Sequence, residues 1–389
     1  RVAERNSDPM RIACVQEQLS RGLATVGRAV SSRTTMPVLG HVLLATDGER
    51  LRLAATNLEL GITTWISARV FEEGRATVPA RLLAEFVNSL PSGKDVSIDG
   101  GTRGAPLHLS CDRISANVKG MDPDEFPPLA TGDDRPAVRI PSREFRTMID
   151  QVAFSAARDE SRPVLGGVNV KVSGAQLTLA AADGFRLSVR HARLDHGLPE
   201  PLDIIVPARA LTELGRLLGG DDDEVELSVT GNRTQVLFRV RTADGETVLV
   251  SRLLEGQFPD LQRVIPKTAT TEMTISRSEL ATAIKIASIF ARDAANVVRL
   301  DLQPGDEGGV TPGTLEITAT APDVGDNKSQ MPAGITGDET HISFSAEFLS
   351  DVLGVLKSDR IHLKLTGPLS PAVIEGVGVE DYTHVIMPM

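Results

Sequence analysis

Residues 78–86 read VPARLLAEF, and two later stretches repeat this pattern: residues 206–214 read VPARALTEL and residues 344–352 read FSAEFLSDV. Each copy is followed by an alternating, strand-like run that begins at Asp95, Glu224 or Arg360. The copies are 128 and 138 positions apart. A solenoid repeat is much shorter, roughly 20–50 residues, whereas this period has the size of a whole domain. The sequence therefore predicts three similar domains in tandem.

A second set of matches fixes the register of the repeats. TMPVLG at residues 35–40 corresponds to SRPVLG at residues 161–166, with only a degenerate copy, NVVRL, at residues 296–300. LRLAATN and LTLAAAD then follow in the first two repeats, and each of these repeats closes on a Phe-Pro pair, at Phe126 and Phe258. From this order we predict domains at residues 10–132, 136–266 and 269–389.

Each repeat reads as helix, strands, helix, strands. Ser142 and Ser276 are candidate N-caps, and Glu279 completes a capping box with Ser276. Short alternating runs outnumber the helical segments, so the predicted fold class is α+β, with antiparallel sheets and helices packed on one face. The predicted helices are Val15–Arg33, Pro79–Leu90, Ser142–Arg162, Pro207–Leu218, Ser276–Arg299 and Ser345–Lys357.

Composition restricts the class of protein. Cys14 and Cys111 are the only cysteines, too few for a disulfide framework, and this usage is typical of a reducing cytoplasm. No run approaches 18 consecutive apolar residues, so no membrane partner is expected. The polar residues 1–9 are interpreted as an extension without a role in the fold. We expect a cytoplasmic protein.

The net charge of −11 is unevenly distributed. The six predicted helices together carry +4, so the rest of the chain carries −15. Helix faces of mixed charge in contact with solvent explain this distribution. An acidic body with an arginine-bearing helical surface that faces a polyanion explains it equally well.

The chain shows no pattern of catalytic or metal-binding residues. Its histidines, at positions 41, 108, 191, 196, 341, 362 and 384, are scattered, with no pair at metal-ligand spacing on a predicted helix. Residues 100–104 lack the spacing of a phosphate-binding loop and are better interpreted as a hairpin turn, and the acidic run 221–224 as a solvated turn. We therefore predict no catalytic residues, no metal and no cofactor.

Short motifs along the chain resemble one known family. They are MRI at residues 10–12, TMPVLG at 35–40, TVPAR at 77–81, ADGFRL at 182–187, IVP at 205–207, GQFPD at 256–260, VIPK at 264–267 and VIMPM at 385–389. In this order they are similar to the bacterial DNA polymerase sliding clamp, the β subunit of the replicative polymerase holoenzyme. The resemblance spans Met10 to Met389.

The resemblance implies a ring-shaped processivity factor without catalytic activity. Two subunits join head to tail in a homodimer, with sheets outside and two helices per domain inside. Such a ring encircles double-stranded DNA without reading its sequence, because phosphate contacts carry no sequence information. The implied partners are the α subunit of the replicative polymerase, the clamp loader, and repair polymerases and other clamp-binding proteins, all acting at the replisome on the nucleoid.

The resemblance also implies three sets of functional residues. The DNA-binding set is Arg33, Arg81, Arg158 and Arg209, although Asp159 and Glu160 beside Arg158 depart from the best-known pattern. The dimer interface is implied at Ile114, Ile289 and Phe290. The partner-peptide pocket is implied at Arg162, Leu165, Gly184, Phe185, Arg186, Leu187, Pro259, Arg263, Val264, Leu369, Pro371, Val385, Met387, Pro388 and Met389.

Two other classes of protein remain open at this point. A non-enzymatic scaffold unrelated to DNA would keep the triple repeat but lack a basic central surface. A hydrolase that uses Asp and His would need a clustered pocket, which the scattered histidines disfavour.

Overall fold

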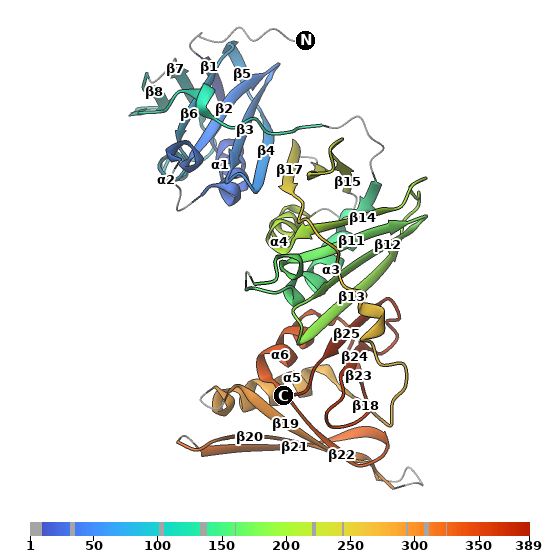
Figure 1. Cartoon of the computed structure of the whole chain (residues 1–389). Helices are drawn as coiled ribbons and strands as arrows, with labels where there is room; N and C mark the ends of the chain where they lie inside the picture. Colours follow the sequence, from blue (N-terminus) through green and yellow to red (C-terminus); the bar gives the residue numbers. More distant parts are fainter. Residues whose placement is uncertain are drawn as a thin grey trace. The chain divides into compact units, whose positions relative to one another are not determined.

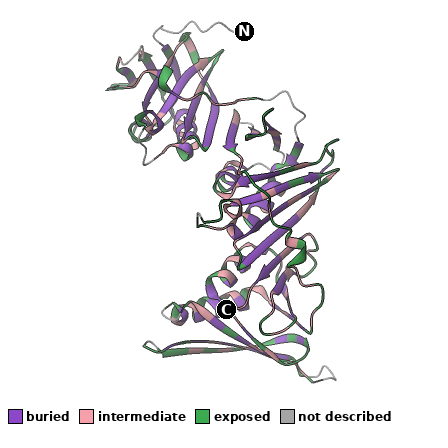
Figure 2. Ribbon diagram, viewed as in Figure 1, coloured by how far each residue is buried: buried purple, intermediate pink, exposed green. Residues whose placement is uncertain are grey.

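The structure is a computed structural model, and it describes residues 10–31, 36–100, 105–132, 138–159, 161–219, 223–242, 245–292, 295–306, 311–323 and 325–389 (Figure 1). By spatial contact the chain divides into two compact units. The first unit comprises Arg1–Phe145 and Glu213–Leu253, and the second comprises Arg146–Thr212 and Leu254–Met389. Each unit is built around antiparallel sheets, and many of the buried residues lie on their strands (Figure 2).

The first unit contains two sheets. The smaller consists, in spatial order, of β5 (Arg69–Glu72), β1 (Met10–Val15), β7 (Asp95–Gly100), β8 (Leu107–Cys111) and β9 (Ile114–Val118). The larger consists of β10 (Val138–Pro141), β15 (Glu224–Val229), β16 (Gln235–Thr242), β17 (Gly245–Arg252), β4 (Leu60–Ser67), β3 (Arg50–Thr56), β2 (His41–Asp47) and β6 (Arg75–Pro79). The pairing of β4 with β17 joins strands of the first and second repeats in one sheet.

Two helices cover the sheets of the first repeat, α1 (Gln16–Val26) and α2 (Ala80–Asn88). The buried face of α1 includes Leu19, Leu23 and Val26, which recur at the spacing of an amphipathic helix. Gln16 is the polar exception on this face. Its amide donates a 2.7 Å hydrogen bond to the carbonyl oxygen of Val87, so the buried polar group is satisfied and ties α1 to α2.

The second unit contains one large sheet that crosses from the second repeat into the third. It consists of β14 (Leu202–Pro207), β11 (Gly167–Ser173), β12 (Gln176–Ala182), β13 (Arg186–Arg193), β25 (Tyr382–Ile386), β24 (Ala372–Gly376), β23 (Arg360–Leu365), β18 (Thr271–Ser276), β21 (Gly325–Gly337), β20 (Gly313–Ala321), β19 (Val297–Gln303) and β22 (Thr340–Ser345). The crossing occurs where β13 pairs with β25, from Arg186↔Ile386 to Arg190↔Tyr382.

Helices α5 (Arg277–Ala291) and α6 (Ala346–Val355) pack against each other, and α5 packs on β19, β20 and β21. Their buried residues, including Ile284 and Leu353, form one core with the strands of the third repeat. Ser276 caps α5 as predicted, because its hydroxyl accepts a hydrogen bond from the amide of Glu279. Ser142, the other predicted cap, is instead the first helical residue of α3 (Ser142–Val152), and its buried hydroxyl has no partner in the described structure.

The repeated sequence pattern begins a helix at the same place each time. Ala80, Ala208 and Ala346 are the first residues of α2, α4 (Ala208–Leu217) and α6. The two PVLG motifs likewise form matching 3-10 helices, η2 (Pro37–Gly40) and η5 (Pro163–Gly166). Equivalent sequence therefore gives equivalent local structure in successive repeats.

Three predicted helices are too long. The first ends at Val26 and continues only as the 3-10 turn η1 (Gly27–Ala29), and the third ends at Val152 and continues as η4 (Ala153–Ser155). The fifth ends at Ala291. Ala295 and Asn296 adopt left-handed φ angles of 55° and 58°, which end helical propagation. The degenerate repeat at 296–300 consequently enters strand β19 and is not helical.

Other sequence expectations fall partly outside the described residues. Residues 1–9 lie outside them, as do residues 101–104 and 221–222 of the two predicted turns. Both cysteines are free and buried. No helix among the described residues is long and apolar enough to cross a membrane.

Candidate functional site

The motif ADGFRL forms the tight turn between β12 and β13. The amide of Asp183 donates to the carbonyl oxygen of Arg186 (3.2 Å), so Gly184 and Phe185 form a two-residue hairpin loop. Gly184 has a φ of +97°, which L side chains rarely adopt, and glycine at the first central position is typical of a type II′ turn. The loop presents the side chain of Phe185, which is 57% exposed.

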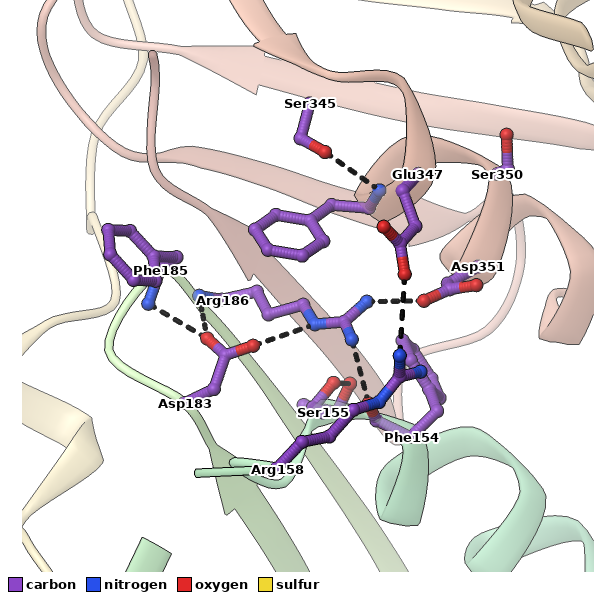
Figure 3. A network of polar contacts seen from close by, with 12 residues as sticks. Phe154, Ser155, Arg158, Asp183, Phe185, Arg186, Ser345, Glu347, Ser350 and Asp351 are labelled. Atoms are coloured by element: carbon purple, nitrogen blue, oxygen red, sulfur yellow. Dashed lines mark hydrogen bonds and ion pairs between the residues drawn. The ribbon is translucent and has the colours of Figure 1, made fainter. Parts of the chain in front are cut away.

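The carboxylate of Asp183 stabilises this turn from inside. Its Oδ1 accepts hydrogen bonds from the amides of Phe185 (2.8 Å) and Arg186 (2.9 Å), and its Oδ2 lies 3.1 Å from Nε of Arg186. One side chain therefore fixes both the backbone of the turn and the direction of the arginine that follows it (Figure 3).

The guanidinium of Arg186 is buried, with only 3% of its side chain exposed. It donates to Asp351 of α6 (2.6 Å) and to the carbonyl oxygen of Phe154 in η4 (2.9 Å). The rings of Phe154 and Phe348 lie 5.2 and 4.3 Å from its central carbon, within range for cation–π attraction. Arg186 thus joins the hairpin to α6, a helix of the third repeat (Figure 3).

The C-terminal tail lies beside the hairpin. The amide of Met387 donates to the carbonyl oxygen of Phe185 (2.7 Å), and the amide of Met389 donates to Ser343 on β22 (2.9 Å). Met387 and Pro388 are half-buried, whereas Met389 is exposed. Pro371 precedes Ala372, which pairs with Ile386 at the end of β25.

A third segment packs on the same strands. Phe258, Leu261 and Ile265 contact a buried apolar cluster that contains Leu187 of β13 and Val385 of β25. The segment includes the short helix η6 (Leu261–Arg263). Three of the predicted pocket residues, Pro259, Arg263 and Val264, lie on this segment, and all three are exposed.

The fifteen predicted pocket residues therefore differ in accessibility. Arg186, Leu187 and Val385 are buried, so they hold the surface residues in place and are not themselves accessible to a peptide. Arg162 is exposed, donates to the carbonyl oxygen of Asp183 (2.8 Å) and lies against Gly184. Leu165 is half-buried, and its amide donates a hydrogen bond to the carbonyl oxygen of Arg162. Leu369 is 88% exposed on the loop between β23 and β24.

The arginines predicted to contact DNA come from separate elements. Arg33 lies outside the described residues. Arg81 on α2 and Arg209 on α4 are exposed, and Arg81 pairs with Glu85 at 2.9 Å. Arg158 follows η4, with 78% of its side chain exposed, and lies 3.5 Å from Glu347 of α6. Hydrogen bonds from the hydroxyl and amide of Ser161 lower the pKa of neighbouring Asp159, which is therefore negatively charged at neutral pH.

The predicted interface residues are exposed to different degrees. Ile114 begins the edge strand β9 and is 41% exposed, and Ile289 on α5 is 56% exposed. Phe290 is partly buried and packs against the core of the third repeat. Ile286, which is not in the predicted set, is 42% exposed and precedes Ile289 by three residues, so the two share one helix face.

A surface cavity of the second unit lies away from the hairpin residues. A surface cavity of about 420 Å³ in the second unit is lined by Thr274, His362, Glu375 and residues 376–380, and it contains none of the predicted site residues. No cluster of metal-binding side chains occurs among the described residues. The hairpin at residues 183–186, the tail at residues 387–389 and the segment at residues 258–265 together form the hairpin site. It is a surface of exposed apolar groups beside a few fixed polar groups, which suits binding rather than catalysis.

Known proteins match this chain along its length. The domain models of the DNA polymerase III beta subunit match in order: the N-terminal domain at residues 10–130, the central domain at 139–260 and the C-terminal domain at 262–389. The beta sliding clamp of Synechocystis sp. is 34% identical over 398 residues, which cover 98% of this chain and 99% of that protein.

Solved structures agree with these sequence matches. A DNA polymerase sliding clamp from Bacillus subtilis has a TM-score of 0.90 at 29% identity, covering 98% of this chain and 99% of that one. A sliding clamp from Pseudomonas aeruginosa, solved bound to griselimycin, has a TM-score of 0.87 at 27% identity, covering 98% and 100%.

Three sheet-rich α+β domains in tandem, matched in order from residue 10 to residue 389, define a clamp fold. The chain belongs to the DNA polymerase III beta subunit family, the beta sliding clamps. It is a DNA sliding clamp, a non-catalytic processivity factor of DNA replication.

Proposed function

We propose that two copies of this chain join head to tail into a closed ring that encircles duplex DNA and recruits partner proteins through the hairpin site. The observation that carries the proposal is that, among the described residues, the first repeat has an open strand edge at β9 and the third repeat has one along β21. Two copies supply the six domains that close the ring. The ring acts in the cytoplasm, at the replisome on the nucleoid.

Two open edges support the head-to-tail joint. Strand β9 is the last strand of the smaller sheet of the first unit. In the second unit, residues 325–333 of β21 pair only with β20 among the described residues, since pairing with β18 begins at Gly334 (Figure 1). An unpaired edge offers backbone amides and carbonyls to another strand. Pairing β9 of one copy with β21 of the other satisfies both edges.

Apolar side chains flank both edges. Ile114 is exposed on β9, and Ile286 and Ile289 are exposed on α5, which packs on β21. Joining the two edges brings these isoleucines out of water, and each fully buried side chain of this size stabilises an interface by about 1.5–3 kcal/mol. The same joint forms twice in a head-to-tail dimer.

Arginines on the helices hold DNA in this proposal. Arg81 and Arg209 each follow the alanine that starts an inner helix, and Arg33 and Arg158 complete the set. Contacts to phosphate depend on charge and not on base sequence, so the ring slides. The acidic remainder of the chain keeps DNA from adhering elsewhere.

The hairpin site binds extended peptide segments of the polymerase α subunit, the clamp loader, repair polymerases and other clamp-binding proteins. Phe185, Leu369 and Met389 supply exposed apolar contacts. Arg162 and Arg263 supply polar contacts at the border, and flexible methionine side chains adapt to different peptides. Free segments of this kind lose entropy on binding, so each binds with modest affinity.

Loading on circular DNA tests the ring. Clamps loaded onto a nicked circle are expected to remain bound and to dissociate when the circle is cut to a linear molecule, because retention is topological. Equal retention on both forms contradicts encirclement. In solution, the mass should be near twice the chain mass of 41.5 kDa, and a monomer mass contradicts the dimer.

A further inference from the structure

We propose that Asp351 of α6 is a positioning residue for the peptide site, although it lies in the third repeat and outside the set of contact residues. The proposal rests on the hairpin being the peptide-binding site. It concerns how the exposed Phe185 is kept in one place, and it assigns that task to a contact between Asp351 and Arg186.

Phe185 is fixed through its backbone on both sides. Its amide donates to Oδ1 of Asp183 (2.8 Å), and its carbonyl oxygen accepts from the amide of Met387 (2.7 Å). The carboxylate of Asp183 is therefore the internal support of the loop. Only 14% of the Asp183 side chain is exposed, so water does not readily replace it.

Asp183 is also a partner of the Arg186 guanidinium, through a single 3.1 Å contact from Nε to Oδ2. The other side of the guanidinium is held by Asp351, where Nη1 lies 2.6 Å from Oδ2. Nη2 donates to the carbonyl oxygen of Phe154 (2.9 Å), so each guanidinium nitrogen has its own acceptor and only Oδ2 of Asp183 is engaged (Figure 3). Oδ1 of Asp183 stays available to the amides of Phe185 and Arg186.

Loss of the Asp351 carboxylate sets up a competition. A buried guanidinium that has lost one carboxylate pairs more fully with the one that remains, because arginine prefers two parallel hydrogen bonds to a carboxylate. That pairing withdraws Oδ1 of Asp183 from the turn amides. The loop then loses its internal support, and Phe185 no longer has a fixed position before the peptide arrives.

The test measures binding of a dye-labelled, extended peptide taken from the polymerase α subunit and chosen because it binds the wild-type chain. Asp351→Ala is expected to lower its affinity about tenfold, the effect of losing one hydrogen bond to a charged group. Asp351→Asn, which keeps an acceptor oxygen, is expected to restore most of the affinity. Hydrogen exchange of the Phe185 amide should be faster in Asp351→Ala than in the wild type.

Asp381 provides a matched control. It pairs at 2.5 Å with Arg190, another buried arginine of β13, and it too belongs to the third repeat. Asp351→Ala and Asp381→Ala each remove a partner of a buried arginine, so both should lower the midpoint of urea unfolding. Asp381→Ala should nevertheless leave peptide affinity and hydrogen exchange of the Phe185 amide unchanged. Glu347→Ala, one turn before Asp351 on α6, should also leave affinity unchanged, because its pair with Arg158 is exposed.

The outcomes separate the inference from the proposed function. If Phe185→Ala leaves peptide affinity unchanged, the hairpin is not the site and both ideas fail. If Phe185→Ala weakens binding and Asp351→Ala does not, only the positioning role is overturned. Equal losses in Asp351→Ala and Asp381→Ala also overturn it, since they indicate general loosening of the joint between β13 and β25.

Discussion

The hydroxyl of Ser188 lies 2.8 Å from Nδ1 of His384, and this hydrogen bond crosses the line where β13 of the second repeat pairs with β25 of the third. Ser155 and Tyr382 also contact the Ser188 hydroxyl, at 2.8 and 3.2 Å. His384 is completely buried and stacks on Phe154. Burial, and to a smaller extent the nearby charge of Arg186, lowers the pKa of His384 to about 3.

Acid should therefore weaken the second unit through His384. An unfolded histidine has a pKa of about 6.5, so the unfolded chain takes up this proton as the pH falls below that value while the folded chain does not. The free energy of unfolding then decreases from pH 6.5 toward pH 3, by about 2 kcal/mol at pH 5 for this one group. Urea unfolding at pH 7 and pH 5 measures the effect.

The control for this prediction is His384→Gln. Its stability should be lower than that of the wild type at pH 7, and the difference should narrow by pH 5. His191→Gln is a second comparison, because partial burial lowers the pKa of His191 as well. Its difference in stability from the wild type should also narrow between pH 7 and pH 5. If the difference in the free energy of unfolding between the wild type and His384→Gln is the same at pH 7 and pH 5, His384 is not a buried neutral histidine.

Charges placed on α5 should separate the subunits. Ile286→Glu with Ile289→Glu is expected to give a particle near 41.5 kDa in sedimentation, since a carboxylate is costly to bury in an apolar joint. Phe290 is avoided because it packs on the core. Leu82→Glu on α2, another exposed apolar residue, should sediment as the wild type. If the double variant sediments with the mass of the wild type, α5 does not take part in the joint between subunits.

Removal of Met387–Met389 should weaken all partner peptides together. The deletion removes the bond from Met387 to Phe185 and one apolar side of the site, but it leaves β9, α5 and β21 intact. Peptide affinity is expected to fall while the dimer mass stays the same. Met389→Ala, which keeps the backbone, should have a smaller effect. Wild-type affinity in the truncated chain argues against the assigned site.

Reversal of charge on an inner helix should reduce binding to DNA. Arg209 is exposed on α4, and Arg209→Glu should lower affinity for a short duplex and flatten its dependence on salt. Arg299→Glu is the charge-matched control, on strand β19, where Arg299 pairs with Asp301 at 2.8 Å. Titrations at several salt concentrations compare the two variants. Equal losses indicate a general effect of charge and not a contact.

Cys14 should resist alkylation in the folded protein. Burial, with a smaller contribution from Asp95, raises the pKa of its thiol to about 12, so the reactive thiolate is scarce at pH 8. Peptide mapping after iodoacetamide treatment should find Cys14 modified only when urea is present. The variant Cys111→Ser isolates the signal of Cys14. Rapid modification without urea contradicts the burial of this thiol.

The repeats were predictable because their start signals are local. Pro79 and Pro207 precede helices that begin one residue later, and Ser276 caps α5. The predicted helix ends at Arg162 and Arg299 were wrong because those ends depend on tertiary structure. A 3-10 turn at 153–155 and left-handed residues at 295–296 divert the chain, and neither has a strong sequence signal.

The geometry of the proposed peptide site was only partly predictable from the sequence. The motif around Gly184 gives the hairpin directly, because the turn needs a positive φ. The partner of Arg186 could not be inferred, since Asp351 lies 165 positions away and meets it only through the pairing of β13 with β25. Ile286, which we add to the proposed joint, could have been named from the sequence, because it precedes Ile289 by one helical turn.

The two sheets that cross between repeats have a consequence during synthesis. Strand β13 leaves the ribosome long before its neighbour β25, at residues 382–386, exists. At roughly 5–20 residues per second, the wait is roughly 10 to 40 seconds. During this interval one side of β13 is an open strand edge. Another chain that is being made on the same messenger RNA can carry a finished β25, the strand that this edge would pair with. Dense translation of one message thus favours exchange of β25 between neighbouring chains, which a chaperone bound to β13 would prevent.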